Sequence, residues 1–207
     1  MIRIGLSSRI IKDDTSSEKR DAISHDWYPF LKEALPEANW LILPNLGIDI
    51  APYVQDWELN GFILTGGNDI GAEPVRDTTE YFLLEYAISH NLSLFGVCRG
   101  LQVLHTYFGG GLVDCHEKHE RKRHTIKVNK KVIGENDNEI HEVNSFHKFG
   151  IMVEGLTDKL FPFAISAETL VEGLLIPDTR IMAVMWHPER EKPYSQYDIA
   201  LIRRCFI

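Results

Sequence analysis

The segment around Cys98 constrains this chain more than any other. The apolar run 92–97 is typical of a buried strand, and residues 101–108 follow with helical apolar spacing. Between them, Gly96, Cys98 and Gly100 stand at alternate positions. This is the spacing of the sharp strand-to-helix turn that presents a nucleophile, with Cys in the place of Ser. The sequence therefore predicts a strand, a tight turn at Cys98 and a helix.

Such a turn puts the Cys98 sulfur at the amino end of a helix, where the helix dipole and free N–H groups favour the nucleophilic thiolate. The alternative is a buried structural cysteine in a glycine-containing turn, because free cysteines are among the most buried residues. The short motif alone leaves both interpretations open.

The first half of the chain alternates strand-like runs with helical patterns, which predicts a largely parallel sheet with helices on both faces. The shorter apolar runs of the second half are interpreted as antiparallel additions to that sheet. We therefore expect an α/β fold and one domain over 1–207, with a polar loop at 8–19. The expected strands are 2–7, 40–43, 61–64, 92–97, 125–128, 142–144, 163–167, 171–176 and 181–186, and the expected helices are 27–35, 50–57, 78–90, 101–108 and 194–206.

The composition excludes several classes of protein. The chain is 44% hydrophobic and 25% charged, as soluble globular proteins are, and its net charge of -8 does not favour nucleic acid or anionic membranes. No apolar run reaches membrane-spanning length, and the amino-terminal run is too short for a secretion signal. Cys98, Cys115 and Cys205 show no paired spacing, which fits a reducing, cytoplasmic setting. A homodimer is an open alternative.

A base and its partner are predicted at the end of the run 181–186. His187, Pro188 and Glu189 follow it, and Pro188 favours an extended conformation at His187. Side chains alternate along an extended segment, so His187 and Glu189 can point the same way. The carboxylate could then hold the imidazole tautomer that faces the sulfur. A surface His and Glu at a strand end is the alternative, and the Cys98 turn makes it the weaker one.

A second glycine-bearing turn, 65–68, follows the predicted strand 61–64. The ends of neighbouring parallel strands face one crevice, so this turn is expected near Cys98. The N–H groups of Gly67 and Arg99 could there hold a tetrahedral oxyanion. Without Cys98, the turn would be read as an ordinary glycine turn.

Three motifs together resemble the class I glutamine amidotransferases. G-V-C-R-G-L-Q at 96–102 resembles the nucleophile motif of that family, W-H-P-E at 186–189 its His-Pro-Glu motif, and T-G-G-N-D at 65–69 its oxyanion loop. They occur in the order of the family. The resemblance implies a flavodoxin-like, mostly parallel sheet, a Cys-His-Glu triad and no metal or organic cofactor.

A fourth segment, V-N-S-F-H at 143–147, resembles the V-N-S-x-H signature of the gamma-glutamyl hydrolase branch. Many members of that branch read S-x-H-x-Q, whereas Phe149 stands here in the place of the Gln. The resemblance implies hydrolysis of a small gamma-glutamyl amide to glutamate and an amine or amidate. The residues that it would make functional are Cys98, His187 and Glu189 as catalytic residues, Gly67 and Arg99 at the oxyanion, and Gly66, Gln102, Asn144, Ser145, Phe146 and His147 at the substrate.

Two other classes of protein stay open as alternatives. One is an amidotransferase subunit that passes ammonia to a synthetase, and the other is a non-catalytic protein that binds gamma-glutamyl compounds. The intact residues Cys98, His187 and Glu189 argue against a non-catalytic protein.

The segment 116–131 is basic in an acidic chain, with seven Lys or Arg residues against two Glu. It predicts either a solvated hairpin or an anion-binding rim for a phosphorylated, nucleotide-linked leaving group. His116, His119 and His124 lie in it, but Cys or carboxylate partners at ligand spacing are missing, so no metal site is predicted.

Overall fold

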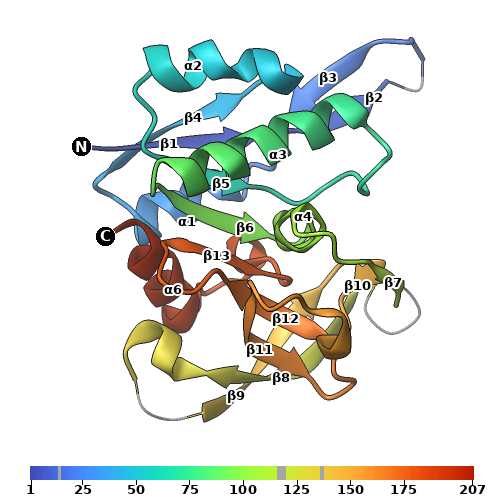
Figure 1. Cartoon of the computed structure of the whole chain (residues 1–207), viewed down its shortest axis with the longest axis vertical. Coiled ribbons are helices and arrows are strands. Elements are labelled where there is room, and N and C mark those ends of the chain that lie inside the picture. Colours follow the sequence, from blue (N-terminus) through green and yellow to red (C-terminus); the bar gives the residue numbers. More distant parts are fainter. Residues whose placement is uncertain (14, 116–119, 136–137) are drawn as a thin grey trace.

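One sheet joins both halves of the chain in the computed structural model (Figure 1). The structure describes residues 1–13, 15–115, 120–135 and 138–207. Within them, nine strands form the sheet in the order β4-β1-β5-β6-β13-β12-β11-β8-β9. The first five strands of this order run parallel, and the pairings from β13 to β9 are antiparallel. Their bounds are β4 Ala38–Leu43, β1 Ile2–Ser7, β5 Gly61–Leu64, β6 Ser93–Val97, β13 Ile181–Val184, β12 Val171–Leu175, β11 Phe161–Ser166, β8 Lys122–Asn129 and β9 Asn138–Ser145.

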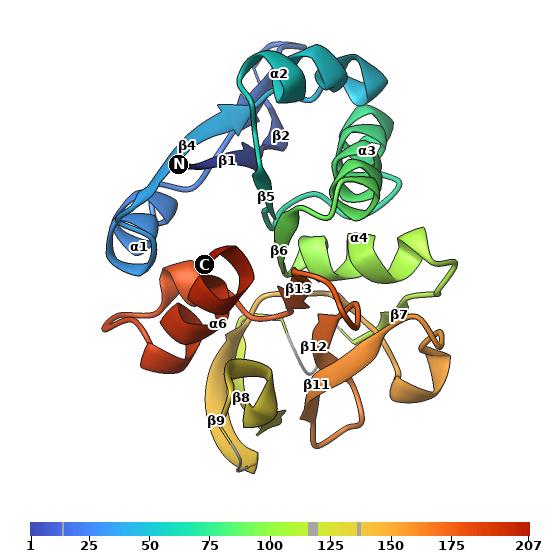
Figure 2. The ribbon, with the colours of Figure 1, turned by 60° about the vertical axis from the view of Figure 1, so that its left-hand side comes forward.

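Helices cover both faces of the parallel strands (Figure 2). On one face lie α1 (Trp27–Ala34) and α6 (Gln196–Phe206), whose buried side chains share a core with the strands. On the other lie α2 (Ala51–Asp56), α3 (Pro74–Ser89) and α4 (Arg99–Tyr107), with a second buried core. The prediction of a mostly parallel α/β sheet with helices on both faces is confirmed. That 1–207 forms one domain stays a prediction.

Smaller elements complete the described chain. The remaining strands are β2 Arg9–Lys12, β3 Lys19–Ala22, β7 Val113–Asp114 and β10 Phe149–Gly150, and the short 3-10 helices are η1 Gly47–Ile50, η2 Lys130–Ile133, η3 Val153–Gly155 and η4 Pro188–Arg190. The strands β7 and β10 pair antiparallel beside the end of α4.

The predicted polar loop at 8–19 is wrong, because β2 and β3 form an antiparallel hairpin there. Only Ile10 is buried in β2, and the other side chains of the hairpin lie in solvent or at its edge. Such a strand carries no apolar alternation that a sequence pattern could reveal. The helix predicted at 78–90 begins earlier, at Pro74. Proline is tolerated in the first turn of a helix, because the backbone N–H that it lacks would have no hydrogen-bond partner inside the helix there.

The interpretation of 181–186 as an antiparallel addition is also wrong. The strand β13 pairs parallel with β6, with Ala183 opposite Gly96, and it pairs antiparallel only with β12. The direction of pairing depends on contacts between segments that are distant in sequence, which a local apolar run does not encode. As a result, β13 ends on the same side of the sheet as β5 and β6.

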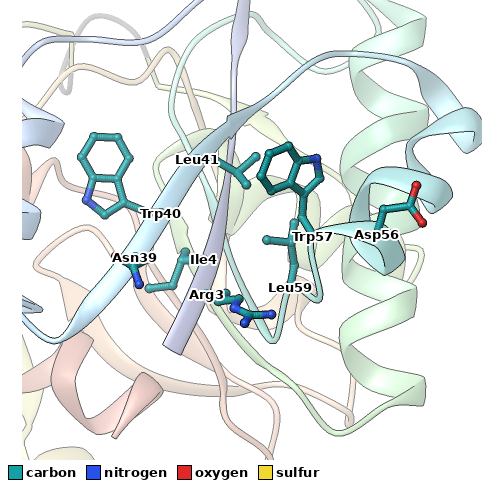
Figure 3. Close-up of a pocket in the computed structure, with 8 residues that line it drawn as sticks. All are labelled: Arg3, Ile4, Asn39, Trp40, Leu41, Asp56, Trp57 and Leu59. Carbon is teal, nitrogen blue, oxygen red and sulfur yellow. The ribbon is translucent and has the colours of Figure 1, made fainter. Parts of the chain in front are cut away.

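A pocket of about 480 Å³ lies at the β4 edge of the sheet (Figure 3). It is lined by Arg3, Ile4, Asn39, Trp40, Leu41, Asp56, Trp57 and Leu59. These residues come from the first half of β1, from residues 39–41 of β4, from the end of α2 and from the segment between α2 and β5. The pocket is therefore at the amino ends of the parallel strands, opposite the carboxyl ends that carry Cys98.

The packing of β6 against α4 requires glycine on both sides of Cys98. A Cβ atom on Gly96 would lie 2.7 Å from the Gly100 carbonyl carbon and 2.8 Å from the Ala183 side chain. One on Gly100 would lie 2.5 Å from the Leu64 carbonyl oxygen. Real Cβ atoms do not approach backbone this closely, so α4 could not pack here with larger residues.

We expect Gly100→Ala to lower the free energy of unfolding by about 1–3 kcal/mol, because the added methyl group overpacks a backbone contact. Gly155→Ala is the matched control, since a Cβ atom there would meet nothing within 4 Å. Urea denaturation followed by circular dichroism measures both. Equal midpoints for the two variants would contradict this account of the turn.

Candidate active site

Cys98 occupies a strained turn between β6 and α4. Its backbone has φ 52° and ψ -98°, a left-handed conformation that residues other than glycine rarely adopt. The Cys98 N–H donates to the Val184 carbonyl at 2.7 Å, which ties the turn to the end of β13. Strain of this kind gathers at functional sites, where the surrounding structure enforces it. The sulfur therefore stands at the start of α4 and at the carboxyl end of β6.

His187 and Glu189 follow β13 at the same end of the sheet. The Nδ1 atom of His187 lies 2.7 Å from Oε1 of Glu189, and both side chains are buried. The short helix η4 begins at Pro188 and turns the carboxylate back toward the ring. The carboxylate accepts from Nδ1–H, so Nε2 is the ring atom left to face the thiol.

The His187 imidazole interacts with both Cys98 and Glu189. Burial lowers the pKa of His187, but the Glu189 carboxylate, the Cys98 thiolate and hydrogen bonds to both side chains together raise it to about 9. The ring is therefore held in its protonated form at neutral pH when the thiolate is present. A histidine beside the thiol is the kind of base that activates a cysteine nucleophile.

The glycine turn after β5 closes the site from the other side. A Cβ atom on Gly66 would lie 2.6 Å from Cε1 of His187 and 3.6 Å from Cβ of Cys98. Only glycine fits in that position. The structure thus brings Gly66, Cys98 and His187 together at the carboxyl ends of three adjacent parallel strands, β5, β6 and β13.

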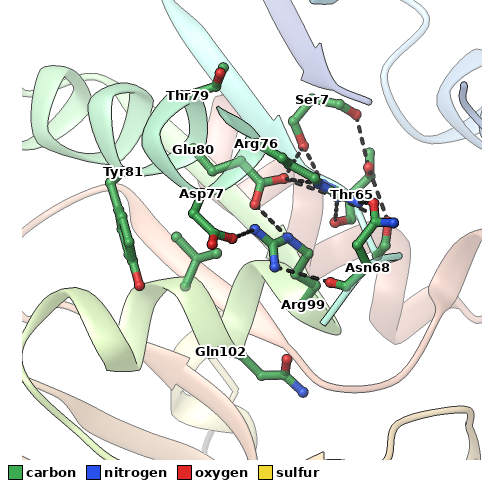
Figure 4. Close-up of polar contacts among 12 residues, drawn as sticks. Ser7, Thr65, Asn68, Arg76, Asp77, Thr79, Glu80, Tyr81, Arg99 and Gln102 are labelled. Atoms are coloured by element: carbon green, nitrogen blue, oxygen red, sulfur yellow. Dashed lines mark hydrogen bonds and ion pairs between the residues drawn. The ribbon is translucent and has the colours of Figure 1, made fainter. Parts of the chain in front are cut away.

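A buried ion network holds this turn in place (Figure 4). Glu80 in α3 accepts from Arg76 at 3.0 Å and from Arg99 at 2.8 Å, and all three side chains are almost completely buried. Arg99 also binds Asp77 at 2.6 Å and donates to the Asn68 carbonyl at 3.0 Å. The network joins α3, the start of α4 and the glycine turn into one unit.

Arg76 fixes the orientation of the peptide groups in the turn. Its Nη2 donates to the carbonyls of Thr65 at 2.8 Å and Gly66 at 3.1 Å. In a trans peptide the carbonyl and the next N–H point in opposite directions, so the Gly67 N–H points away from Arg76. The Arg99 N–H is in the first turn of α4, where N–H groups lack partners inside the helix. The role of both N–H groups in holding an oxyanion stays a prediction.

Asn144 lies against the backbone of His187. Its Nδ2 donates to the His187 carbonyl at 2.8 Å and to Glu191 at 2.8 Å, while its Oδ1 accepts from the His187 N–H at 2.9 Å. These bonds occupy the amide, so the geometry makes Asn144 a positioning residue for His187. Its predicted contact with substrate stays a prediction.

The other predicted substrate residues surround the site at varied depth. Gln102 is buried and donates to the Phe149 carbonyl at 3.0 Å, and Ser145 is completely buried in β9. The Phe146 ring is 40% exposed and meets the His187 ring edge-on, with 5.6 Å between centroids. The substrate contacts expected of these residues stay predictions.

His147 belongs to a buried polar cluster beneath the site. Its Nδ1 contacts the Phe149 carbonyl at 3.1 Å and the Cys115 sulfur at 3.4 Å, and its Nε2 lies 3.8 Å from Glu172. His124 contacts the same carboxylate at 3.2 Å. Burial raises the pKa of Glu172, against the effect of His124, which lowers it. The cluster connects β8, β12 and the segment before β10.

Cys115 is half-buried and Cys205 is buried. Like Cys98, both are free thiols. Burial raises the pKa of Cys115 to about 12 and raises that of Cys205 further, so both stay protonated. Within the described ranges, no group of three His, Cys, Asp or Glu side chains could hold a metal ion, and no helix is both long and apolar enough to cross a membrane. His116 and His119 lie outside the described residues.

The sequence motifs did not reveal the residues that position the site. Arg76 and Glu80 are four apart in α3, a helical spacing that could have suggested an ion pair. Nothing in that spacing indicates burial or the contact with Arg99. The pairing of Asn144 with His187 joins residues 43 apart, and it had no local signal.

We expect Glu80→Gln to lower the free energy of unfolding by about 3–5 kcal/mol, because two buried arginines lose their shared carboxylate. Glu37→Gln is the matched control: its pair with Arg203 is about 40% exposed on both sides, and such pairs contribute about 0–1 kcal/mol. Chemical denaturation of both variants tests the difference. Similar losses would show that the network adds no more than a surface pair.

The chain resembles known proteins over most of its length. The chain matches the Peptidase C26 family over residues 4–189. It is 29% identical to the gamma-glutamyl-CDP-amidate hydrolase of Campylobacter jejuni, covering 95% of this chain and 94% of that protein. It is 25% identical to the gamma-glutamyl-gamma-aminobutyrate hydrolase of Escherichia coli O157:H7, covering 85% and 72%.

A solved structure shows the same fold. The glutamine amidotransferase of Thermotoga maritima superposes with a TM-score of 0.65 over 91% of this chain and 76% of that one, at 14% sequence identity. The expected class I glutamine amidotransferase-like fold is thereby confirmed. The chain belongs to the peptidase C26 family.

Proposed function

We propose that this protein is a cysteine-dependent hydrolase of gamma-glutamyl amides. The observation that carries the proposal is the convergence of Cys98, His187, Glu189 and Gly66 at the carboxyl ends of three adjacent strands. The first three form the proposed Cys-His-Glu triad. Family membership and the two hydrolases of gamma-glutamyl compounds among its relatives support the same reaction class.

In the first step, the Cys98 thiolate attacks the side-chain carbonyl carbon of the glutamyl group. The carbonyl oxygen becomes an oxyanion, which the N–H groups of Gly67 and Arg99 stabilise. His187 gives its Nε2 proton to the departing nitrogen as the carbon–nitrogen bond breaks. The products are a thioester on Cys98 and a free amine or amidate.

In the second step, water replaces the amine. Neutral His187 takes a proton from water, whose oxygen attacks the thioester carbon. The carbon–sulfur bond then breaks, glutamate leaves, and Cys98 returns as thiolate beside protonated His187. Glu189 holds Nδ1 throughout, which keeps Nε2 directed at the reacting atoms. The cycle needs no metal or organic cofactor.

The glutamyl group of the substrate is proposed to lie between the glycine turn and β10. Gln102 reaches that side of the site, where it is fixed by the Phe149 carbonyl. In this arrangement Gly66 allows close approach of the carbonyl carbon to the sulfur. Asn144 acts from behind, by holding the His187 backbone.

The finer proposal is the substrate gamma-glutamyl-CDP-amidate, cleaved to glutamate and cytidine diphosphoramidate. It is supported by the 29% identity with the hydrolase of that compound, which extends over nearly the whole of both chains. We assign the reaction to cytoplasmic synthesis of capsule phosphoramidate. Hydrolysis of gamma-glutamyl-gamma-aminobutyrate is the second candidate, because the relative that bears that name matches 85% of this chain.

Glutamate release from a panel of gamma-glutamyl compounds tests the proposal. We expect release from gamma-glutamyl-CDP-amidate above release from gamma-glutamyl-gamma-aminobutyrate and glutamine. Cys98→Ala should lower kcat by on the order of 10⁴-fold or more, since the nucleophile is lost. Cys205→Ala is the control, because that buried thiol lies at the far end of β6. No release from any member of the panel would refute the reaction class.

The raised pKa of His187 predicts the alkaline limb of the pH profile. The protonated ring is required to release the amine. The value of kcat/KM should therefore be fully retained at neutral pH and should fall as the pH rises through about 9. Glu189→Gln removes a carboxylate that raises this pKa, so its alkaline limb should move to lower pH. Its kcat should also drop by on the order of 10²–10⁴-fold.

Glu154→Gln, on the exposed helix η3, is the control for loss of one carboxylate. Its profile should coincide with that of the unmodified enzyme. An alkaline limb that does not move in Glu189→Gln would show that Glu189 does not set the charge of His187.

A further inference from the structure

A basic pocket of about 280 Å³ lies next to His187. It is lined by Arg121, Lys122, Arg123, Asn144, Phe146, Arg190 and Glu191. Four of these side chains are cationic and one is a carboxylate, in a chain whose net charge is -8. The pocket therefore concentrates positive charge at one place on an acidic protein.

Two residues that line this basic pocket also contact His187. Phe146 contacts the His187 ring edge-on at 5.6 Å between centroids, at an interplanar angle of 83°. Asn144 binds the His187 backbone through both ends of its amide. A leaving group that departs from the substrate's carbonyl carbon on the side of His187 would therefore reach the basic pocket.

Two of the four cations of the pocket are held by their neighbours. The Arg190 guanidinium lies over the Phe146 ring, 4.6 Å from its centroid. Arg123 binds Glu142 at 2.5 Å and Glu191 at 2.8 Å. These contacts fix the direction of two long side chains before any ligand arrives, which lowers the entropy lost when an anion binds.

We propose that the basic pocket binds the phosphate or diphosphate group of the substrate's leaving portion. This inference rests on the proposed function, and it names the chemical class of that leaving portion. His187 must stand on the side of the scissile nitrogen, because it protonates that atom. The glutamyl group lies on the other side, by Gln102. An anionic leaving group thus extends toward Phe146 and the cations.

The size of the pocket agrees with a small anion. Its volume of about 280 Å³ is sufficient for a phosphate or diphosphate group. The nucleoside end of a larger leaving group extends into solvent. Arginine binds phosphate oxygens with two parallel N–H bonds, and three of the four cations here are arginines.

The decisive variant is Arg121→Glu/Lys122→Glu, which reverses two charges of the pocket without touching the triad. We expect its KM for gamma-glutamyl-CDP-amidate to rise at least tenfold, while kcat/KM for glutamine changes less than twofold. Unchanged glutamine hydrolysis also shows that the variant is folded. The matched control is Lys32→Glu/Arg204→Glu, two exposed sites on α1 and α6 with the same change of net charge. It should leave both constants unchanged.

Binding of inorganic pyrophosphate and of cytidine diphosphate, measured by calorimetry, tests the pocket apart from catalysis. Both should bind the unmodified enzyme and Cys98→Ala, and both should bind the charge-reversed variant at least tenfold more weakly. Binding of cytidine diphosphate without pyrophosphate would overturn the proposal, since recognition would then rest on the nucleoside. Equal binding to the charge-reversed variant would overturn it as well.

The two proposals fail in different ways. If no gamma-glutamyl compound is hydrolysed, the proposed function fails, whatever the calorimetry shows. If hydrolysis proceeds but the charge-reversed variant keeps the KM of the unmodified enzyme for gamma-glutamyl-CDP-amidate, only the inference about the basic pocket fails. A milder variant, Arg121→Gln/Lys122→Gln, replaces the charge-reversed one if that protein does not fold, with the same outcomes.

Discussion

Cys98 keeps its left-handed backbone because the structure leaves no room for another path between β6 and α4. Gly96 and Gly100 allow the strand and the helix to approach β5 and β13 closely. The Cys98 N–H donates a hydrogen bond to the Val184 carbonyl at the end of β13, with 2.7 Å between nitrogen and oxygen. Strain of about 1–3 kcal/mol at one residue is small against such packing. Every other part of the site is placed relative to this turn, since β5 and β13 are the neighbours of β6.

The buried network of Arg76, Asp77, Glu80 and Arg99 adds rigidity without adding net charge. Two guanidinium groups face two carboxylates, so the electric fields of the four groups largely cancel at the Cys98 sulfur. The network sets the direction of the peptide groups after β5 and at the start of α4. The charge that a thiolate meets directly comes instead from His187, whose pKa Glu189 and Cys98 raise.

Local patterns predicted the parts of this protein that depend on neighbours in sequence. The strand 61–64, the turn at Cys98 and the His187–Glu189 spacing all lie within a few residues, where periodicity and glycine positions carry the information. The parallel pairing of β13 with β6 and the bond between Asn144 and His187 depend on segments far apart in the chain. No short pattern encodes them, so the sequence predicted which side chains stand at the strand ends but not what holds them in place.

A cationic pocket beside a protonated histidine poses an electrostatic conflict, since like charges lower the pKa of the ring. The arrangement of three side chains resolves it. The Phe146 ring has Arg190 over its face and His187 in edge contact, and it adds apolar bulk beside both cations. Glu189 lies 2.7 Å from the His187 ring and 3.5 Å from Arg190, so one carboxylate attracts both cations and reduces their mutual repulsion. In the proposed reaction, the protein can therefore attract an anionic leaving group and still retain the proton that the departing nitrogen needs.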